Sequence, residues 1–231
     1  MTQGVTARDK GARKTFVIAI DGPAASGKSS TAQMVAEKLG YLHVDSGSLY
    51  RAATAAMLRS EKVASQWTEQ AVLEAARPIE LRAARTSFYP VLEGRAIEDE
   101  IRGAEVTDNV SRVAQMPLVR QWVNEKVKGA ANSADVVVDG RDMGTVVFPD
   151  ADLKIFLVAD SRERAARRLR QRGTPTSQQL LDDETMRIIE RDIRDAGQTV
   201  PAADAVVIDT TGLTQLEQVE QIVTLSRQGS G

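Results

Sequence analysis

The sequence contains no cysteine, which excludes disulfide bonds, thiol nucleophiles and zinc sites built on cysteine. It contains one histidine, His43, so a histidine-rich metal site is excluded as well. Aromatic residues make up 4% of the 231 residues, and the net charge is −2. Nucleic-acid-binding surfaces need an excess of positive charge, often with aromatic rings on which bases stack, so this composition argues against a nucleic-acid partner.

Long apolar runs are also missing, because no stretch approaches the length of a membrane span, about 18 residues. Residues 1–14 are polar and basic and lack the apolar segment of a secretory signal. We expect a disordered arm there and a frayed tail at residues 226–231. Together with the absence of cysteine, these features predict a cytoplasmic protein without a membrane partner, and we expect a monomer.

A phosphate-binding loop is the most specific pattern in the sequence. Residues 22–29 read Gly-Pro-Ala-Ala-Ser-Gly-Lys-Ser, which places two glycines, a lysine and a hydroxyl at the offsets of a P-loop. The apolar run at residues 16–21 predicts a buried strand before the loop, and residues 30–39 predict a helix after it. Strand, loop and helix are the context that the motif requires, which disfavours a chance match in an ordinary turn.

The residue types of this loop predict a triphosphate ligand. Gly22 and Gly27 let the backbone approach phosphate oxygens, and amides of the loop and helix N-terminus donate hydrogen bonds to them. Lys28 supplies a positive charge at the β- and γ-phosphates, and the Ser29 hydroxyl is a ligand for Mg²⁺. The expected triphosphate-binding residues are Gly22, Pro23, Ala24, Ala25, Ser26, Gly27, Lys28, Ser29 and Ser30.

Five apolar segments predict an α/β fold with a five-stranded parallel sheet of the P-loop NTPase type. The segments are residues 16–21, 41–45, 135–139, 153–159 and 205–209. Because their interiors are almost wholly apolar, helices should cover both faces of the sheet. Three of the segments end in an aspartate, namely Asp21, Asp45 and Asp139, at the carboxyl edge where such sheets bind ligands.

The region between residues 61 and 112 breaks this pattern. Residues 78–85, 87–92 and 95–97 alternate apolar and polar side chains, and Glu93-Gly94 supplies a turn. We expect a small antiparallel domain inserted at residues 61–112 over the active edge. The core domain would then comprise residues 15–60 and 113–225.

Polar side chains follow the second strand at the expected active edge. Residues 45–51 read Asp-Ser-Gly-Ser-Leu-Tyr-Arg, and Arg51 is suited to bind a second phosphate. The alternative is a helix start with Asp45 or Ser46 as its N-cap, which is compatible with a site.

The third strand ends in a second polar segment, Asp-Gly-Arg-Asp-Met-Gly at residues 139–144. Asp139 is placed to hold Mg²⁺ directly or through water, and Arg141 and Asp142 project into the same cleft. The alternative is an Asp-Gly turn with a structural ion pair.

Positive charge is concentrated further along the chain, with six arginines within residues 161–172. Alone, this run is typical of a solvated helix face. Downstream of a phosphate loop it predicts a lid, at residues 161–185, that neutralises the transferred phosphoryl group and excludes water. We expect Arg168 and Arg172 to reach the phosphates.

Two further features have alternative interpretations. Arg191, Arg194 and Asp195 can share one helix face, either as local pairs or as part of a site. His43 lies inside a predicted strand, and we expect a packed core residue rather than a general base, because an acceptor phosphate is already anionic.

The sequence resembles bacterial cytidylate kinases, a family of nucleoside monophosphate kinases, from about residue 15 to residue 211. The segments that carry the resemblance are Ile20-Asp21-Gly22-Pro23, Asp45-Ser46-Gly47, Leu49-Tyr50-Arg51, Gly140-Arg141-Asp142-Met143-Gly144-Thr145-Val146-Val147-Phe148-Pro149, Glu190-Arg191-Asp192 and Pro201-Ala202-Ala203-Asp204-Ala205. The resemblance implies phosphorylation of CMP and dCMP by ATP with Mg²⁺, and a core, a lid and an inserted CMP-binding domain.

The resemblance also implies roles for individual residues. The implied acceptor-site residues are Ser46, Tyr50 and Arg51, with Ser111 and Arg120 at the cytosine, Asp142 at the sugar or base, and Asp195 at the pentose. The expected catalytic residues are Lys28, Arg141, Arg168, Arg172 and Arg191, of which Arg191 also binds the acceptor, and the expected metal-binding residues are Ser29 and Asp139.

One segment departs from the family pattern. After Asp195 the family has a further arginine and a proline-containing stretch, whereas this chain reads Ala-Gly-Gln-Thr-Val at residues 196–200. The acceptor phosphate then loses one cation, or a neighbour such as Arg194 replaces it.

Other functions fit parts of the sequence. A related small kinase would act on another monophosphate or on a metabolite hydroxyl. A nucleotide-switch GTPase would carry an Asn-Lys-x-Asp element after a strand, but the fourth strand is followed by Asp160-Ser161-Arg162-Glu163. An RNA-binding protein that uses the arginine run would need overall positive charge and interleaved aromatic residues.

Overall fold

Side-chain alternation in the central strand gives the sheet an apolar layer on each face. The computed structural model describes residues 15–60, 63–175 and 177–228, so the expected arm at 1–14 lies outside the described residues. In β1 (Val17–Asp21), Val17 and Ala19 join one buried apolar cluster, whereas Ile18 and Ile20 join another on the opposite face. This two-sided burial explains the continuous apolar run in the sequence.

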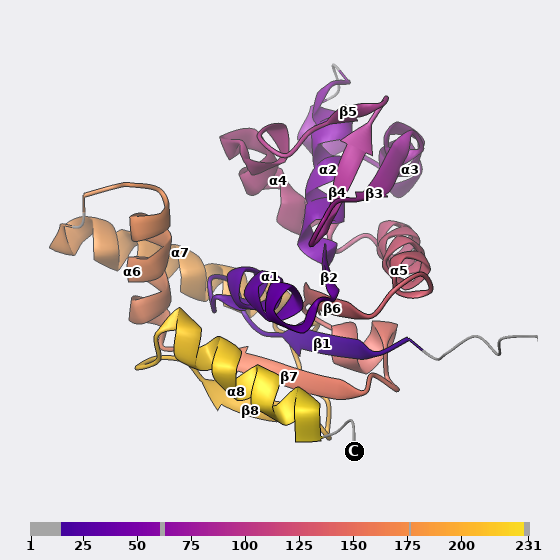
Figure 1. Cartoon of the computed structure of the whole chain (residues 1–231). Helices are drawn as coiled ribbons and strands as arrows, with labels where there is room; N and C mark the ends of the chain where they lie inside the picture. The colour runs from indigo at the N-terminus through magenta and orange to yellow at the C-terminus, as the bar shows by residue number, and fades with distance from the viewer. Residues whose placement is uncertain (1–14, 61–62, 176, 229–231) are drawn as a thin grey trace, which may run out of the picture.

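The five predicted strands form one parallel sheet, which confirms the predicted fold class (Figure 1). The strand order is β2 (Leu42–Asp45), β6 (Val136–Gly140), β1, β7 (Leu153–Val158) and β8 (Val206–Asp209). In this register the end of β1 lies between β6 and β7, and Asp45 lies opposite Asp139 on the neighbouring strand. The polar segments after β1, β2 and β6 therefore lie side by side.

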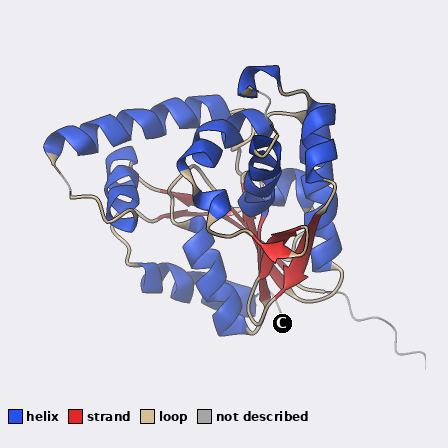
Figure 2. Ribbon diagram, turned by 90° about the horizontal axis from the view of Figure 1, so that it is seen from above, coloured by secondary structure: helices blue, strands red, loops and turns tan. Residues whose placement is uncertain are grey.

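Helices cover both faces of the sheet (Figure 2). On one face, α1 (Lys28–Leu39) and α8 (Gln215–Gln228) pack against the apolar cluster that contains Ile18 and Ile20. On the other face, α2 (Ser46–Leu58) and α5 (Pro117–Ala131) pack against the cluster that contains Val17. A π-helical turn, Met143–Val147, follows β6.

A three-stranded antiparallel sheet lies between α2 and α5 in the chain. Its strands are β3 (Ile79–Ala83), β4 (Phe88–Leu92) and β5 (Arg95–Ala96), in the order β3-β4-β5. The short η1 (Ala64–Gln66) and α3 (Glu69–Ala76) precede it, and η2 (Glu100–Arg102) and α4 (Ala104–Val113) follow it. Its buried apolar residues belong to the same cluster as Val17 of the core strand.

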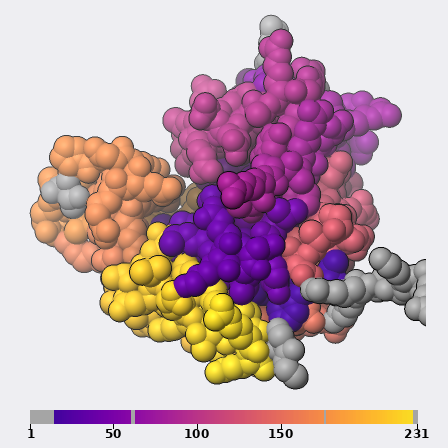
Figure 3. Space-filling model, viewed as in Figure 1, coloured from indigo at the N-terminus to yellow at the C-terminus, as the bar shows by residue number. Residues whose placement is uncertain are grey.

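The helices α6 (Ser161–Gln171) and α7 (Gln178–Asp195) pack against each other and form a separate lobe at the left of Figure 3. The expected frayed tail needs a correction for three residues, because residues 226–228 end α8, and Ser226 is buried with its hydroxyl bonded to the Val223 carbonyl at 2.8 Å. Residues 229–231 lie outside the described part of the chain. Among the described helices, none combines the length and apolar character that a bilayer crossing requires.

Candidate active site

The P-loop connects β1 to α1, and its glycines stand where other residues would clash or be strained. A Cβ on Gly22 would lie 2.3 Å from the Leu157 carbonyl oxygen, so only glycine lets the loop cross β7 this closely. Gly27 has φ +91° and caps α1, which begins at Lys28. The first amides of α1 therefore face the space in front of the loop, where an anion would be stabilised.

Lys28 is buried beneath the loop, and its ammonium group donates to the Pro23 carbonyl at 3.1 Å. Burial, followed by the positive charge of Arg141, lowers the pKa of Lys28 to about 7. The carboxylates of Asp139 and Asp45 offset part of this effect, and a phosphate group in front of the loop would add a further negative partner for the buried ammonium group. The surroundings of Lys28 are thus those of a phosphate site.

Ser29 and Asp139, the two residues expected to bind magnesium, meet next to the loop. The Ser29 hydroxyl donates to Asp139 Oδ2 at 2.6 Å. Burial alone would raise the pKa of Asp139, but the hydrogen bond and charge of His43, with the charge of Lys28, hold it below its usual value. A hydroxyl and an ionised carboxylate are hard oxygen ligands, so these residues fit Mg²⁺, which keeps several of its waters in proteins.

His43 is buried, as expected, but it does more than pack in the core. Its Nε2 lies 2.7 Å from Asp139 Oδ1, so the imidazole contacts the carboxylate oxygen that Ser29 does not use. The histidine backbone N–H also bonds the Thr86 carbonyl at 3.0 Å, in the turn between β3 and β4. His43 therefore links the small sheet to the predicted metal ligand.

The segment after β2 caps α2, as one of its two interpretations predicted, and it also contacts the expected site residue Asp139. Asp45 accepts the Ser48 backbone N–H at 3.2 Å as the N-cap. Ser46 donates to the Asp139 carbonyl at 2.8 Å. Arg51 donates to the Ile101 carbonyl at 3.2 Å and to a threonine hydroxyl of α4 at 3.1 Å, which orients it from the inserted region.

Arg120 of α5 is the centre of a polar group that the sequence had connected only through the resemblance. Its NH2 forms an ion pair with Asp142, and its NH1 bonds the Ala114 carbonyl at 3.0 Å and Gln198 Oε1 at 2.8 Å. The guanidinium carbon also lies 5.9 Å from the ring centre of Tyr50. Among the described residues, the buried Tyr50 hydroxyl has no hydrogen-bond partner, and burial raises its pKa to about 12. A buried polar atom without a partner indicates a place for a ligand.

A second group of charges surrounds Asp195 at the end of α7. Asp195 Oδ2 lies 3.4 Å from Arg141 Nε and 3.5 Å from Arg191 Nε. Burial, followed by the charge of Arg141, lowers the pKa of Arg191 to about 10, and Arg168 and Arg51 add to the effect. Arg141 and Arg191 thus meet at one carboxylate, and Arg168 and Arg51 lie near enough for their charges to act on Arg191, an arrangement suited to a phosphate.

The two lid arginines that were expected to reach the phosphates are instead engaged with a carboxylate of α7. Arg168 and Arg172 lie 3.2 and 3.3 Å from the carboxylate of Glu184, a buried residue of α7. Arg168 is close enough to the cluster to affect the pKa of Arg191, whereas Arg172 contributes to neither of the other groups described above. Ser111, on α4, is half-buried, and its hydroxyl makes no hydrogen bond within the described ranges.

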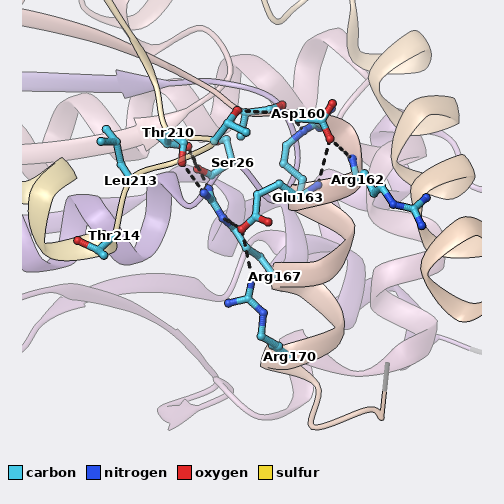
Figure 4. A network of polar contacts seen from close by, with 12 residues as sticks. Ser26, Asp160, Arg162, Glu163, Arg167, Arg170, Thr210, Leu213 and Thr214 are labelled. Carbon is cyan, nitrogen blue, oxygen red and sulfur yellow. Dashed lines mark hydrogen bonds and ion pairs between the residues drawn. The ribbon is translucent and has the colours of Figure 1, made fainter. Parts of the chain in front are cut away.

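Two arginines that sequence reasoning passed over connect α6 to the core, one to the P-loop and one to Thr210. Arg164 of α6 is buried, donates to the Ala24 carbonyl at 2.9 Å and pairs with Asp192 of α7 at 2.6 Å. Arg167 bonds the hydroxyl of Thr210 at 3.0 Å and also its carbonyl (Figure 4). The sequence does not distinguish these two arginines from the other four in the run, because the role of each depends on the residues that it contacts in the folded protein.

Comparison with known proteins gives a consistent result. The family model for cytidylate kinase matches residues 18–228. The chain is 46% identical over 211 residues to the cytidylate kinase of Bordetella bronchiseptica, with 90% of this chain and 92% of that protein covered. It is 41% identical to the cytidylate kinase of Streptococcus mutans (85% and 89% covered) and 36% identical to that of Acholeplasma laidlawii (94% and 97% covered).

Proposed function

The chain belongs to the cytidylate kinase family, and we propose that it transfers the γ-phosphoryl group of ATP to CMP and dCMP, giving CDP or dCDP and ADP. One observation supports this most directly: Arg141 and Arg191 both lie against Asp195, and their charges act on the P-loop lysine, Lys28, so a second group of cations stands beside the loop. An ATPase with one nucleotide needs a single phosphate site. A second cationic cluster next to the first suits an acceptor phosphate.

In the proposed mechanism, Lys28 and the amides of the loop bind the triphosphate of ATP. Arg51, Arg141 and Arg191 orient the acceptor phosphate for in-line attack, and their charge stabilises the equatorial oxygens in the transition state. Ser29 and Asp139 would hold Mg²⁺, which when bound neutralises charge on the phosphates. No general base is needed, because the acceptor oxygen is already anionic.

The lid supplies the remaining charge in this proposal. Arg168 and Arg172 are paired with Glu184 in this structure, and a movement of α6 relative to α7 toward the P-loop would exchange that carboxylate for phosphate oxygens. We propose that Arg120 and Asp142 read the base, with Tyr50 beside them, and that Asp195 binds the pentose. The protein would act as a monomer in the cytoplasm.

The test is steady-state ADP formation from ATP with CMP, dCMP, UMP, AMP and dTMP in turn. CMP and dCMP should be phosphorylated with the highest kcat/KM. Lys28→Ala should abolish transfer while the fold, followed by circular dichroism and thermal unfolding, is retained. A folded Lys28→Ala variant with substantial kinase activity, or ATP hydrolysis that no monophosphate stimulates, would contradict the proposal.

A further inference from the structure

The segment after α7, residues 196–200, lies at the acceptor site although it lacks the arginine that the family resemblance led us to expect there. The Gln198 backbone N–H bonds the Asp195 carbonyl at 2.9 Å, and the Thr199 hydroxyl bonds the same oxygen at 3.0 Å. These bonds fix a turn that places the Gln198 carboxamide against Arg120, with Oε1 2.8 Å from NH1. Arg194, the substitute considered from the sequence, is exposed and forms no ion pair within the described residues.

The contacts of Arg120 leave a defined set of donors for a ligand. Both NH1 hydrogens are engaged, one with the Ala114 carbonyl and one with Gln198, and one NH2 hydrogen is engaged with Asp142. A guanidinium carries five N–H donors in one plane. Nε and the second NH2 hydrogen therefore remain available to a ligand. Their direction is fixed because the plane of the guanidinium is held on two sides. Asp142 holds the plane at NH2, and Gln198 holds it at NH1.

An arginine could not do what Gln198 does. Arginine has no acceptor atom, so at position 198 it would repel Arg120 and compete for the carboxylate of Asp142. A glutamine oxygen accepts from Arg120 and adds no charge. Its presence therefore leaves the Arg120–Asp142 pair intact, as a fixed donor next to a fixed acceptor.

We propose that Gln198 is a specificity-determining positioning residue, which holds the Arg120 guanidinium in the plane that recognises the acceptor base. This inference rests on the proposed function. A fixed donor beside a fixed acceptor suits a pyrimidine that presents a ring acceptor next to an amino group, as cytosine does, and opposes uracil, which presents the reverse order. Gln198 thus acts on acceptor selectivity rather than replacing a phosphate-binding cation.

The experiment compares Gln198→Met, which is close in size but has no acceptor, with Gln198→Glu, which keeps one. Gln121→Met is the control, because Gln121 is exposed on α5 next to Arg120 and bonds Glu125 instead. KM and kcat are measured for CMP, UMP and ATP. We expect Gln198→Met to raise the KM for CMP about tenfold, equivalent to about 1.4 kcal/mol, with the KM for ATP and the Tm unchanged. The ratio of kcat/KM for CMP over UMP should fall to a similar extent, and Gln198→Glu should restore most of it.

A double-mutant cycle with Arg120→Met separates this role from general loosening of the segment. If Gln198 acts through Arg120, Gln198→Met should have no further effect on the KM for CMP once Arg120 is replaced. Additive effects, an unchanged CMP-to-UMP ratio in Gln198→Met, or equal losses toward CMP and ATP would each overturn the inference. Failure of the wild-type enzyme to phosphorylate CMP would instead overturn the proposed function.

Discussion

The inserted region and the lid helices α6 and α7 are held together by different forces. The inserted region, from α3 to α4, buries Val72, Ile79 and Val106 in the same apolar cluster as the central strand β1. The lid helices α6 and α7 bury only Ala165, Leu169 and Ile188 among their apolar residues. Ion pairs join the two lid helices to each other: Glu184 pairs with Arg168 and Arg172, Arg164 pairs with Asp192, and Arg162 pairs with Asp182.

This difference indicates which region is free to rearrange. Apolar contacts are lost when a surface opens, because water replaces them at a cost of about 25 cal/mol for each Å² exposed. An arginine that leaves a carboxylate for a phosphate exchanges one charged partner for another. We therefore expect the larger movement during the reaction in the lid, and the inserted region to behave as an extension of the core.

The strongest test of this difference is to remove apolar volume from the inserted region. Ile79→Ala should lower the free energy of unfolding of the whole protein by about 2–5 kcal/mol, because Ile79 is fully buried in the shared cluster. Chemical denaturation should still show one transition. The control is Ile193→Ala on α7, where the side chain is 71% exposed, and there we expect a change within about 0.5 kcal/mol. Separate unfolding of the inserted region would show that its cluster is independent.

A second prediction concerns the core beneath both regions. Asp21 accepts the backbone N–H groups of Met143 and Gly144, each at 2.8 Å, and burial raises its pKa from 3.8 to about 6. Between pH 4 and pH 6 the unfolded chain releases this proton while the folded protein keeps it. Asp21 should therefore lower the free energy of unfolding by about 3 kcal/mol as the pH rises through this window.

The measurement is the free energy of unfolding of the wild type and Asp21→Asn at a series of pH values. The difference between the two proteins should change across pH 4–6 and be constant above pH 7. A constant difference from pH 4 to pH 8 would mean that Asp21 titrates normally. Comparisons of the lid with the inserted region are then best made above pH 7.

The third prediction concerns the ion pairs of the lid. Glu184→Gln removes the carboxylate shared by Arg168, Arg172 and Arg187. Hydrogen exchange of α6 and α7 should become faster by an amount equivalent to about 1–3 kcal/mol, because the mostly buried Arg168 loses its charged partner. The inserted region should not change. Asp182→Asn is the control, since its pair with Arg162 is exposed. A similar effect there would show that Glu184 stabilises the lid no more than an exposed carboxylate does.

The smallest predicted effect is that of salt. Raising NaCl from about 0.1 to 1 M shortens the Debye length from about 10 to 3 Å and screens the partly exposed lid pairs. Local stability of α6 and α7 should fall by less than about 1 kcal/mol, because exposed ion pairs contribute little. Protection of β3 and β4 in the same exchange experiment should stay the same or rise. Equal losses in both regions would remove the distinction between them.

Sequence patterns predicted the sheet well because its strands are short, largely apolar runs, and the central strands β6, β1 and β7 are buried on both faces. The five predicted strands agree with the observed ones to within one residue at either end. The P-loop and its helix were equally clear, since the local chemistry alone requires them. Prediction was weaker where side-chain partners come from distant segments. The strand position of His43 indicated only that it is buried, whereas its contact with Asp139 depends on β2 and β6 being neighbours in the sheet.

By itself, the sequence determined the elements of this protein and the phosphate-binding chemistry of its loop, because both follow from residues close together in the chain. Only the tertiary structure decided which acceptor each arginine contacts. Arg164 bonds the P-loop, Arg168 and Arg172 pair with Glu184, and Arg120 bonds Gln198. The physical reason is that arginines of one helix have the same local pattern, and a guanidinium takes its role from the acceptors that folding brings within about 3 Å.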